Sequence, residues 1–447
     1  MGAVTHPDET EPTPPLAPQL AGPLPERPSG LVVRHPDPDD EPLRRAAVDA
    51  SFGTPLKPTS AEEADLSERM LPAHNRSLVA EVGPDGVERI LGGAARLDTS
   101  LSLPGGGRVP VAGLTSVGVA PGAHGRGAFR ALLEDHLNEC RERGDAASVL
   151  MASEAPLYGR FGYGLATRSA AWEVDAHVAR RLRPDAPTSG QVTLEPGRGP
   201  ELGDLLHEVR ERSGTRRAGL LTRSPAWWER VLGPTQSWMG GGPLLVALHW
   251  NADGECDGYL MYDVDFRHGR QANAESTITL RELVAPDVAV ELDLWRFAAG
   301  LPWARELHWP HGPVDPAPLF WMENTRALRR MWQADFLWMR PLDLTALTEQ
   351  RTFAADGAVA LQVSDPVFDD LGGRFDLRVR GGAGQWVPAK GPAELQVSIA
   401  DLGELWLGDV SARRLVGAHR ITGDPAAAGR LDAMLATDAA PRSLARF

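Results

Sequence analysis

The 447-residue chain has little lysine, little cysteine and no long apolar run, and each absence excludes a class of protein. Lysine occurs only at Lys57 and Lys390, so arginine supplies nearly all of the 46 basic groups. Cys140 and Cys256 are far apart and form no C-x-x-C pattern, which argues against a disulfide framework and against a zinc site. No apolar run approaches the ~18 residues of a membrane span, so we expect no transmembrane helix.

Several motifs of common enzyme classes are missing as well. The chain contains no G-x-x-x-x-G-K-S/T, no H-E-x-x-H and no G-x-S-x-G, which disfavours a P-loop nucleotidase, a zinc peptidase and a serine hydrolase. His308 and His311 lack a third ligand nearby in the sequence, so we predict no metal site. The first residues have no basic stretch followed by an apolar one, so we expect no secretory signal and a cytoplasmic location.

The charge balance bears on the partners. There are 60 acidic and 46 basic residues, and the net charge is −14. A charge of this sign repels nucleic acid and weakly attracts cationic small molecules. We therefore predict no nucleic-acid partner and a bias towards cationic small molecules.

Composition and periodicity divide the chain into a tail and three domains. Residues 1–30 hold eight prolines and little apolar material, so we predict a disordered tail. Strand and helix patterns then predict domains at residues 31–182, 183–341 and 342–447, the last of them a small α+β domain. A linker is predicted over residues 183–200, which are rich in proline and glycine.

Two segments share the order strand, Val-Ala-Pro, helix, which suggests a duplicated domain. The first is LTSVGVAPGAHGRGAFRALLEDHL at residues 114–137, and the second is TLRELVAPDVAVELDLWRFAAGL at residues 279–301. In the first copy a glycine-rich turn leads from the strand into a helix that we predict over residues 127–143. Such a turn directs backbone N–H groups and the positive end of the helix dipole at one point, which suits a pyrophosphate. An ordinary strand-to-helix turn is the alternative.

A second segment, residues 152–164, contains the string YGRFGYG in a predicted turn from Tyr158 to Gly164. Together with residues 117–127 and the terminal Phe447, it resembles the Eis (enhanced intracellular survival) family of actinobacterial GNAT N-acetyltransferases. The resemblance implies an α/β (α+β) fold with two tandem GNAT domains, the second degenerate, and a C-terminal sterol-carrier-protein-like domain. It also implies acetyl-CoA as co-substrate, no metal and a homohexamer.

The resemblance further implies a reaction: direct transfer of the acetyl group in a ternary complex. The acceptor would be a primary amine of a cationic, aminoglycoside-like small molecule or of a lysine side chain. Tyr158 would be the general acid for the departing thiolate, and the α-carboxylate of Phe447 the general base. A free α-carboxylate has a pKa of roughly 3.3–3.7, so burial near the amine would have to raise that pKa, or a water molecule would have to relay the proton.

The resemblance assigns the remaining site residues to acetyl-CoA and its acceptor. Because His124 stands where the family has arginine or glutamine, phosphate contacts are expected to depend on Arg126 and on backbone amides. Arg160 either lines the acceptor pocket or pairs with a carboxylate. The predicted contacts of acetyl-CoA are Val117, Gly118 and Val119 along the pantetheine, Gly125, Arg126, Gly127, Ala128, Phe129 and Arg130 at the phosphates, and Ser153 and Glu154 beside the pantetheine arm.

Two departures from the family pattern bear on the acceptor. Arg446 precedes Phe447, and Thr54 and Pro55 follow the first helix, at positions where the family has acidic or aromatic residues. These departures argue against strong aminoglycoside binding. Two alternatives stay open: a non-catalytic acyl-CoA or lipid-binding protein that uses the C-terminal domain, and an enzyme that acetylates a glycopeptide or another natural product.

Overall fold

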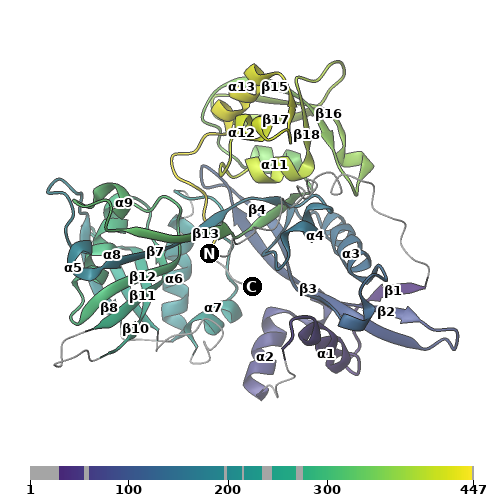
Figure 1. Ribbon diagram of the computed structural model, residues 1–447, viewed down its shortest axis with the longest axis horizontal. Coiled ribbons are helices and arrows are strands. Elements are labelled where there is room, and N and C mark those ends of the chain that lie inside the picture. Colours follow the sequence, from purple (N-terminus) through teal and green to yellow (C-terminus); the bar gives the residue numbers. More distant parts are fainter. Residues whose placement is uncertain are drawn as a thin grey trace, which may run out of the picture.

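The computed structural model describes residues 30–54, 60–195, 199–213, 216–233, 244–267, 275–444 and 447. The molecule has three lobes, each built on one β-sheet, and the end of the chain, marked C in Figure 1, lies between the first two. This arrangement confirms the predicted class of mixed α/β domains. The predicted tail lies outside the described residues except for Gly30. Within the described residues, no helix is long and apolar enough to cross a membrane.

The first lobe contains a seven-stranded sheet in the order β1-β2-β3-β4-β5-β14-β6. Helix α3 packs its apolar stripe against this sheet, and Gly144 ends it in the left-handed conformation with a φ of 77°. Glycine also occupies positive-φ positions in the turn between β2 and β3, at Gly86, and in the turn between β3 and β4, at Gly105. The elements are β1 (Leu31–Arg34), α1 (Glu41–Ser51), α2 (Ala61–Met70), β2 (Arg76–Val82), β3 (Glu88–Ser102), β4 (Arg108–Val119), α3 (Ala128–Arg143), β5 (Ala147–Leu150), α4 (Ala155–Gly159), β6 (Gly164–Leu165) and β14 (Trp338–Pro341).

The second lobe repeats this plan with the sheet order β8-β9-β10-β11-β12-β7-β13. Strand β11, helix α8 and strand β12 correspond to β4, α3 and β5, as the repeated sequence segments suggested. The elements are β7 (Arg168–Asp175), α5 (Ala176–Ala179), β8 (Gly190–Glu195), α6 (Pro200–Ser213), α7 (Pro225–Leu232), β9 (Leu245–Asn251), β10 (Cys256–Asp265), β11 (Ser276–Val284), α8 (Val288–Gly300), β12 (Ala304–Gly312), α9 (Pro318–Trp321) and β13 (Arg329–Asp335).

The first two lobes exchange one strand each. Strand β7 follows β6 of the first lobe in the chain but pairs with β12 and β13 in the second sheet. Strand β14 follows β13 of the second lobe but pairs with β5 and β6 in the first sheet. Each of these strands fills the sixth place in its sheet. The second sheet is built from the continuous run β7 to β13, whereas the first sheet takes β14 from beyond that run.

The third lobe is the predicted small α+β domain, with the sheet order β17-β16-β15-β18-β19. One apolar core runs from the first sheet into this lobe. Arg340 of β14 is fully buried and pairs with Asp365 of the third lobe at 2.7 Å. The elements are α10 (Leu344–Glu349), β15 (Gly357–Ser364), β16 (Gly373–Arg380), β17 (Ala383–Pro388), β18 (Leu395–Ser398), α11 (Ile399–Leu405), α12 (Ala412–Gly417), β19 (Thr422–Gly423) and α13 (Pro425–Leu435).

Two predicted local structures are wrong. The stretch 183–200 is not simply a linker, because it contains β8, an edge strand whose exposed positions tolerate polar residues and glycine. Tyr158 does not lie in a turn but in the short helix α4, which has a proline in its first turn, where the missing N–H costs nothing.

Candidate active site

The site is organised by an opening between strands β4 and β5. These strands pair in parallel only from Val111 opposite Ala147 to Leu114 opposite Leu150. Strand β4 continues to Val119 without β5 beside it. On its other side, the pairing with β3 breaks between Thr115 and Gly118, and Ser116 adopts a positive φ of 51° there. Backbone groups of β4 are therefore available to a ligand that enters the opening.

A cavity of about 700 Å³ extends from this opening to the N-terminus of α3. We call it the α3 cavity. Of the residues predicted to contact acetyl-CoA, the cavity brings together all except Arg126, and it also includes Tyr158 and Arg160. Its lining is Ser51, Phe52, Val117, Gly118, Val119, Ala123, His124, Gly125, Gly127, Ala128, Phe129, Arg130, Ser153, Glu154, Leu157, Tyr158, Arg160 and Phe161.

The N-terminus of α3 has the features of an anion site. Its N-cap is Gly127, with a φ of 77° and no side chain to bind the free N–H groups of the first turn. Gly125 also has a φ of 77°, which allows the loop before the helix to turn tightly. His124 steadies this loop, because its Nε2 lies 3.2 Å from the carbonyl oxygen of Val119.

The two arginines of this region lie differently. Arg126 is half-exposed and donates to Glu81 of β2 at 2.9 Å, outside the lining of the cavity. Arg130 donates from Nε to Glu134 at 2.6 Å, and its buried Nη1 has no hydrogen-bond partner. An unpartnered guanidinium nitrogen beside the helix N-terminus fits a phosphate group. The sequence favoured Arg126 for this contact, whereas the geometry favours Arg130.

Tyr158 lies on the inner wall of the α3 cavity and is 5% exposed. Its ring packs edge to face against Phe129 at 5.6 Å and against Tyr163 at 6.0 Å between ring centroids. Burial raises the pKa of the Tyr158 phenol, and a hydrogen-bonding interaction with the Ser153 side chain partly offsets this rise. The phenol is therefore protonated at neutral pH and can donate a proton.

A second cavity, of about 380 Å³, lies on the other side of the same opening. We call it the chain-end cavity because Phe447 is part of its wall. Thr115 and Ser116 of β4 line it, whereas the next residue, Val117, lines the α3 cavity. The other lining residues are Met70, Leu71, Leu97, Met151 and Arg230. Consecutive residues of one strand thus line the two cavities.

Phe447 reaches this place from the third lobe. Its ring packs on Trp227 of α7, with 6.1 Å between ring centroids. It also lies over β4, because a Cβ atom added to Gly113 would lie 2.9 Å from Cε2 of Phe447. The chain end is therefore enclosed between the first and second lobes, as Figure 1 shows. Pro55 and Arg446, two of the predicted departures, lie outside the described residues, and Thr54 is exposed.

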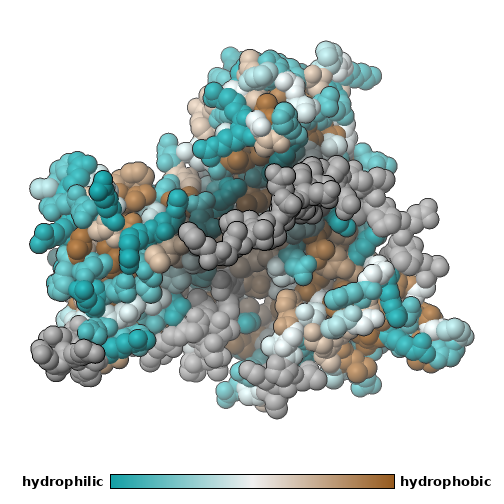
Figure 2. Space-filling model, in the orientation of Figure 1, coloured by the Kyte–Doolittle hydropathy of each residue, from teal (hydrophilic) through white to brown (hydrophobic). Residues whose placement is uncertain are grey.

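Apolar groups also reach the surface of the first lobe. Leu43 and Phe52, at α1 and just after it, are 61% and 56% exposed. Figure 2 shows hydrophobic residues on the drawn face over the lower part of this lobe, where Figure 1 places α1. Phe52 also lines the α3 cavity, so an apolar surface leads to its entrance.

A chain of buried polar groups behind Tyr158 had no recognisable signal in the sequence. The hydroxyl groups of Tyr163 and Ser148 lie 2.7 Å apart, and the Ser148 hydroxyl lies 2.8 Å from Nε2 of His136. Cys140 is one helical turn from His136, with its Sγ 3.4 Å from Nε2. Burial lowers the pKa of His136 to about 3 and raises the pKa of Cys140. These groups are uncharged at neutral pH. They form a buried polar layer next to the packed rings of Phe129, Tyr158 and Tyr163.

One group of side chains with the geometry of a metal site lies in the second lobe. His308 of β12 is 2.9 Å from Glu173 and 3.6 Å from Glu306, a combination that spacing in the sequence does not reveal. Arg329 of β13 pairs with both carboxylates, at 3.2 and 3.7 Å. The four side chains thus form one polar network on the surface of β7, β12 and β13. His311 packs between the rings of Trp332 and Phe336.

Family comparisons match the three lobes in turn. Descriptions of an acetyltransferase (GNAT) domain match residues 33–166 and residues 219–341. The description of a sterol carrier protein domain matches residues 344–442. The matches confirm the predicted order of two GNAT domains and a sterol-carrier-like domain.

Curated relatives match most of the chain. N-acetyltransferase Eis of Mycobacterium tuberculosis (strain CDC 1551 / Oshkosh) is 31% identical over 414 residues, which cover 91% of this chain and 97% of the relative. An uncharacterized N-acetyltransferase of Streptomyces griseus is 32% identical over 349 residues, covering 76% of this chain and 83% of the relative.

Solved structures agree with this result. The crystal structure of Eis1 from Mycobacterium abscessus has a TM-score of 0.79 at 26% identity and covers 93% of this chain and 100% of its own. A GCN5-related N-acetyltransferase from Anabaena variabilis has the same fold, with a TM-score of 0.77 at 21% identity, and covers 93% of this chain and 100% of its own.

Proposed function

Because the chain belongs to the Eis family of GNAT N-acetyltransferases, we propose that it transfers the acetyl group of acetyl-CoA directly to a primary amine where its two cavities meet. The observation that carries this proposal is the junction at Ser116 and Val117. The α3 cavity opens on one side of this junction with Tyr158, and the chain-end cavity opens on the other with Phe447.

The α3 cavity has groups suited to each part of acetyl-CoA. The free N–H groups at Gly127 and the unpartnered Nη1 of Arg130 would hold the phosphates. The open edge of β4 from Val117 to Val119 would bind the pantetheine amides. Bound there, acetyl-CoA supplies a thioester that an uncharged amine can attack.

The chain's own groups would move the two protons. The α-carboxylate of Phe447 takes a proton from the acceptor nitrogen as the nitrogen–carbon bond forms. Tyr158 gives its phenolic proton to the sulfur as the carbon–sulfur bond breaks. Each of these proton transfers is worth about 10²–10⁴ in rate. Because the base and the acid are both present, the acetyl group moves directly from acetyl-CoA to the amine within one ternary complex. The proposed reaction needs neither an acetyl-enzyme intermediate nor a metal.

The wall of the chain-end cavity bears on the acceptor. Among the described residues that line it, Met70, Leu71, Leu97 and Met151 are apolar and Arg230 is cationic. None of these described lining residues has a carboxylate side chain to bind further amino groups. We therefore favour an amine on a largely apolar or short body over a polycationic aminoglycoside, and a lysine side chain meets this description. The expected cytoplasmic location and homohexamer remain proposals.

The non-catalytic alternative has less support. The family is one of enzymes, and the interior of the third lobe, where a lipid would lie, is filled by aromatic rings. Trp386 and Trp406 are 7% and 0% exposed, and Phe375 stacks on Trp386 with 5.2 Å between ring centroids.

The test is a thiol-release assay with acetyl-CoA and a panel of lysine peptides, monoamines, polyamines, aminoglycosides and a glycopeptide. We expect amine-dependent release of CoA, highest for acceptors with a single amine on an apolar or short body. Tyr158→Phe should lower kcat by about 10²-fold or more, with little change in the KM for acetyl-CoA. Release that does not depend on an amine, or wild-type turnover by Tyr158→Phe, would contradict the proposal.

A further inference from the structure

The last residues of the chain are held in place by the second lobe. Alternate residues of the segment after α13 bind there: the N–H of Ala440 donates to Asp315 at 3.0 Å, and the N–H of Arg442 donates to the carbonyl of Ala218 at 2.7 Å. The carbonyl of Leu444 accepts from Arg223 at 3.3 Å. This alternation is that of an extended segment with one face bound.

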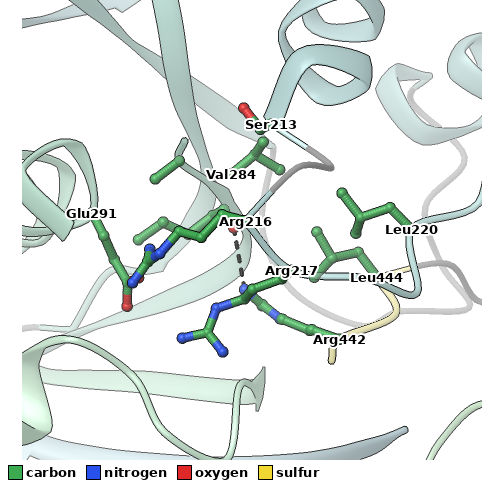
Figure 3. A pocket seen from close by; sticks show the side chains of 10 residues that line it. Ser213, Arg216, Arg217, Leu220, Val284, Glu291, Arg442 and Leu444 are labelled. Carbon is green, nitrogen blue, oxygen red and sulfur yellow. Dashed lines mark hydrogen bonds and ion pairs between the residues drawn. The ribbon is translucent and has the colours of Figure 1, made fainter. Parts of the chain in front are cut away.

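The side chain of Arg442 makes an unusual contact. Its guanidinium donates to the carbonyl of Leu283 on β11 at 3.2 Å and to the carbonyl of His311 on β12 at 2.8 Å. It lies over the ring of Trp309, 5.0 Å from the ring centroid. Figure 3 shows this side chain reaching from the C-terminal segment towards β11, with the bond to β11 dashed. Arg442 thus joins two strands that do not pair with each other at this point.

These two strands correspond to β4 and β5 of the first lobe. Parallel pairing of β11 with β12 ends at Thr279 opposite His308, and beyond this pair the strands separate, as β4 and β5 do. In the first lobe the opening leads to the α3 cavity. In the second lobe Arg442 occupies the opening, and the cavity beside it has a volume of about 30 Å³, which is room for about one water molecule.

The helix that follows also differs between the lobes. Helix α8 is capped by the side chain of Asp287, which accepts from the N–H of Val290 at 3.0 Å, whereas α3 has the bare cap Gly127. A carboxylate at this position repels a phosphate and satisfies the N–H group that a phosphate would bind. The opening in the second lobe is therefore closed to acetyl-CoA and is filled by the chain's own terminus.

The position of Arg442 is energetically costly. The residue is 4% exposed, its Nε has no hydrogen-bond partner, and its described hydrogen bonds go to carbonyl groups. Burial and the neighbouring Arg217 lower the pKa of Arg442 to about 9. A buried guanidinium with no bonded carboxylate does not favour folding by its charge alone. Its effect is to fix the path of the segment that ends at Phe447.

We propose that Arg442 is a positioning residue, and that the degenerate second GNAT domain uses its former cofactor opening to clamp the C-terminal segment and present the carboxylate of Phe447. The role of Phe447 in this proposal rests on the proposed function. The clamp itself does not, because it rests on the contacts of the segment alone. With Leu444 held, three residues separate the clamp from the terminus, because 447 − 444 = 3. If the contacts of Ala440, Arg442 and Leu444 were all lost, the terminus would lie twelve residues beyond the end of α13 at Leu435, because 447 − 435 = 12.

The length of the tether sets the expected effect. The effective concentration of a tethered group falls roughly as the −3/2 power of tether length, so a fourfold longer tether lowers it about eightfold. This eightfold loss is the limit for a fully released segment. Arg442→Gln removes the side-chain bonds and leaves those of Ala440 and Leu444, so kcat should fall severalfold, up to about eightfold, while the KM for acetyl-CoA stays within about twofold because the α3 cavity is untouched. Arg442→Lys, which keeps the charge but not the fork of donors, should recover part of the loss.

A measurement independent of turnover is release of Phe447 by a carboxypeptidase that prefers aromatic C-terminal residues. We expect slow release from the wild-type chain and severalfold faster release from Arg442→Gln. Leu294→Ala is the control, because it removes buried apolar contacts from α8 in the same lobe without touching the segment. Release of Phe447 from the Leu294→Ala variant should stay slow, although the melting temperature of this variant falls.

Arg217→Gln provides a second route if Arg442→Gln does not fold. Arg217 donates to the carbonyl of Ala440 at 2.9 Å, so its loss should also speed release. Wild-type release from both arginine variants would overturn the clamp. If the variants release Phe447 faster but no amine is acetylated by the wild-type protein, the clamp stands and the proposed function fails.

Discussion

The chemistry of single side chains at this site follows from what surrounds them. Tyr158 is an ordinary phenol, but its burial among Phe129 and Tyr163 keeps it protonated, and it forms part of the wall of the α3 cavity. Arg126 and Arg130 are only four residues apart, but they have different partners. Arg126 pairs with Glu81, whereas Arg130 lines the α3 cavity. Motif recognition alone does not separate these two arginines.

That difference yields a test of which arginine binds phosphate. We expect Arg130→Gln to raise the KM for acetyl-CoA about tenfold, because a charge-assisted hydrogen bond of roughly 1.5–3 kcal/mol is lost. Arg126→Gln is the matched control, and its KM should change less than about threefold. Initial rates at saturating amine give both values. A larger effect at Arg126 would return the phosphate contact to the residue that the sequence favoured.

His136 provides a test of the buried polar chain. Its pKa is lowered to about 3 in the folded protein, whereas the ordinary value is 6.5, so below about pH 6.5 the unfolded chain binds a proton that the folded one does not. The stability that depends on neutral His136 is complete above pH 6.5. It is lost as the pH falls towards 3, by up to about 1.4 kcal/mol per pH unit.

Urea unfolding at several pH values between 7 and 5 measures this loss. The free energy of unfolding of wild type should fall more steeply with decreasing pH than that of His136→Gln. His177→Gln, which changes an exposed histidine, is the control. Parallel curves for wild type and His136→Gln would show that His136 is not buried in its neutral form.

Among the secondary-structure elements, β7 and β14 have the largest consequences. Strand β7 connects the first sheet directly to the second, and β14 returns from the second lobe to complete the first sheet. The first sheet therefore cannot lose β14 unless the chain also opens at the end of the second lobe. The pair of lobes is therefore expected to unfold as one cooperative unit rather than as two independent domains.

The distribution of tryptophan makes this coupling measurable. Residues 31–166, which include the α3 cavity, contain no tryptophan, and ten of the thirteen tryptophans lie within residues 172–332, so tryptophan fluorescence mainly follows the second lobe. Trp338 of β14 adds a smaller signal from the first sheet. Acetyl-CoA at 100 times its Kd should stabilise the folded state by about 2.7 kcal/mol. We expect the fluorescence-detected melting temperature of the second lobe to rise as well. If acetyl-CoA leaves the melting temperature of the second lobe unchanged, the predicted coupling between the lobes is contradicted.

The secondary-structure elements also show which parts of the fold could be predicted from the sequence. Helix α3 and the hairpins at Gly86 and Gly105 were predictable, because periodicity and glycine chemistry are local. The exchange of β7 and β14 was not, because it is a choice between distant and chemically similar partners. Most of the α3 cavity was predicted through the resemblance, since its residues follow one another in the chain. The clamp at Arg442 was missed, because nothing local distinguishes a buried arginine in PRSLARF from a solvated one.

At the level of the whole molecule, each lobe has a separate part in one site. The first lobe provides the α3 cavity and Tyr158, the second holds the C-terminal segment against α7, and the third supplies that segment. The duplication thus explains why a domain with a closed cofactor opening is kept. The central claim is that the terminal carboxylate, and not merely the ring of Phe447, serves the reaction.

The most direct test is a chain that ends in the carboxamide of Phe447, prepared by ammonolysis of an intein thioester. The carboxamide keeps the ring, its packing on Trp227 and the length of the chain, but it cannot accept a proton at neutral pH. We predict that kcat falls by about 10²–10⁴ while acetyl-CoA binds as before. A carboxamide enzyme whose kcat lies within about twofold of the wild-type value would contradict the account.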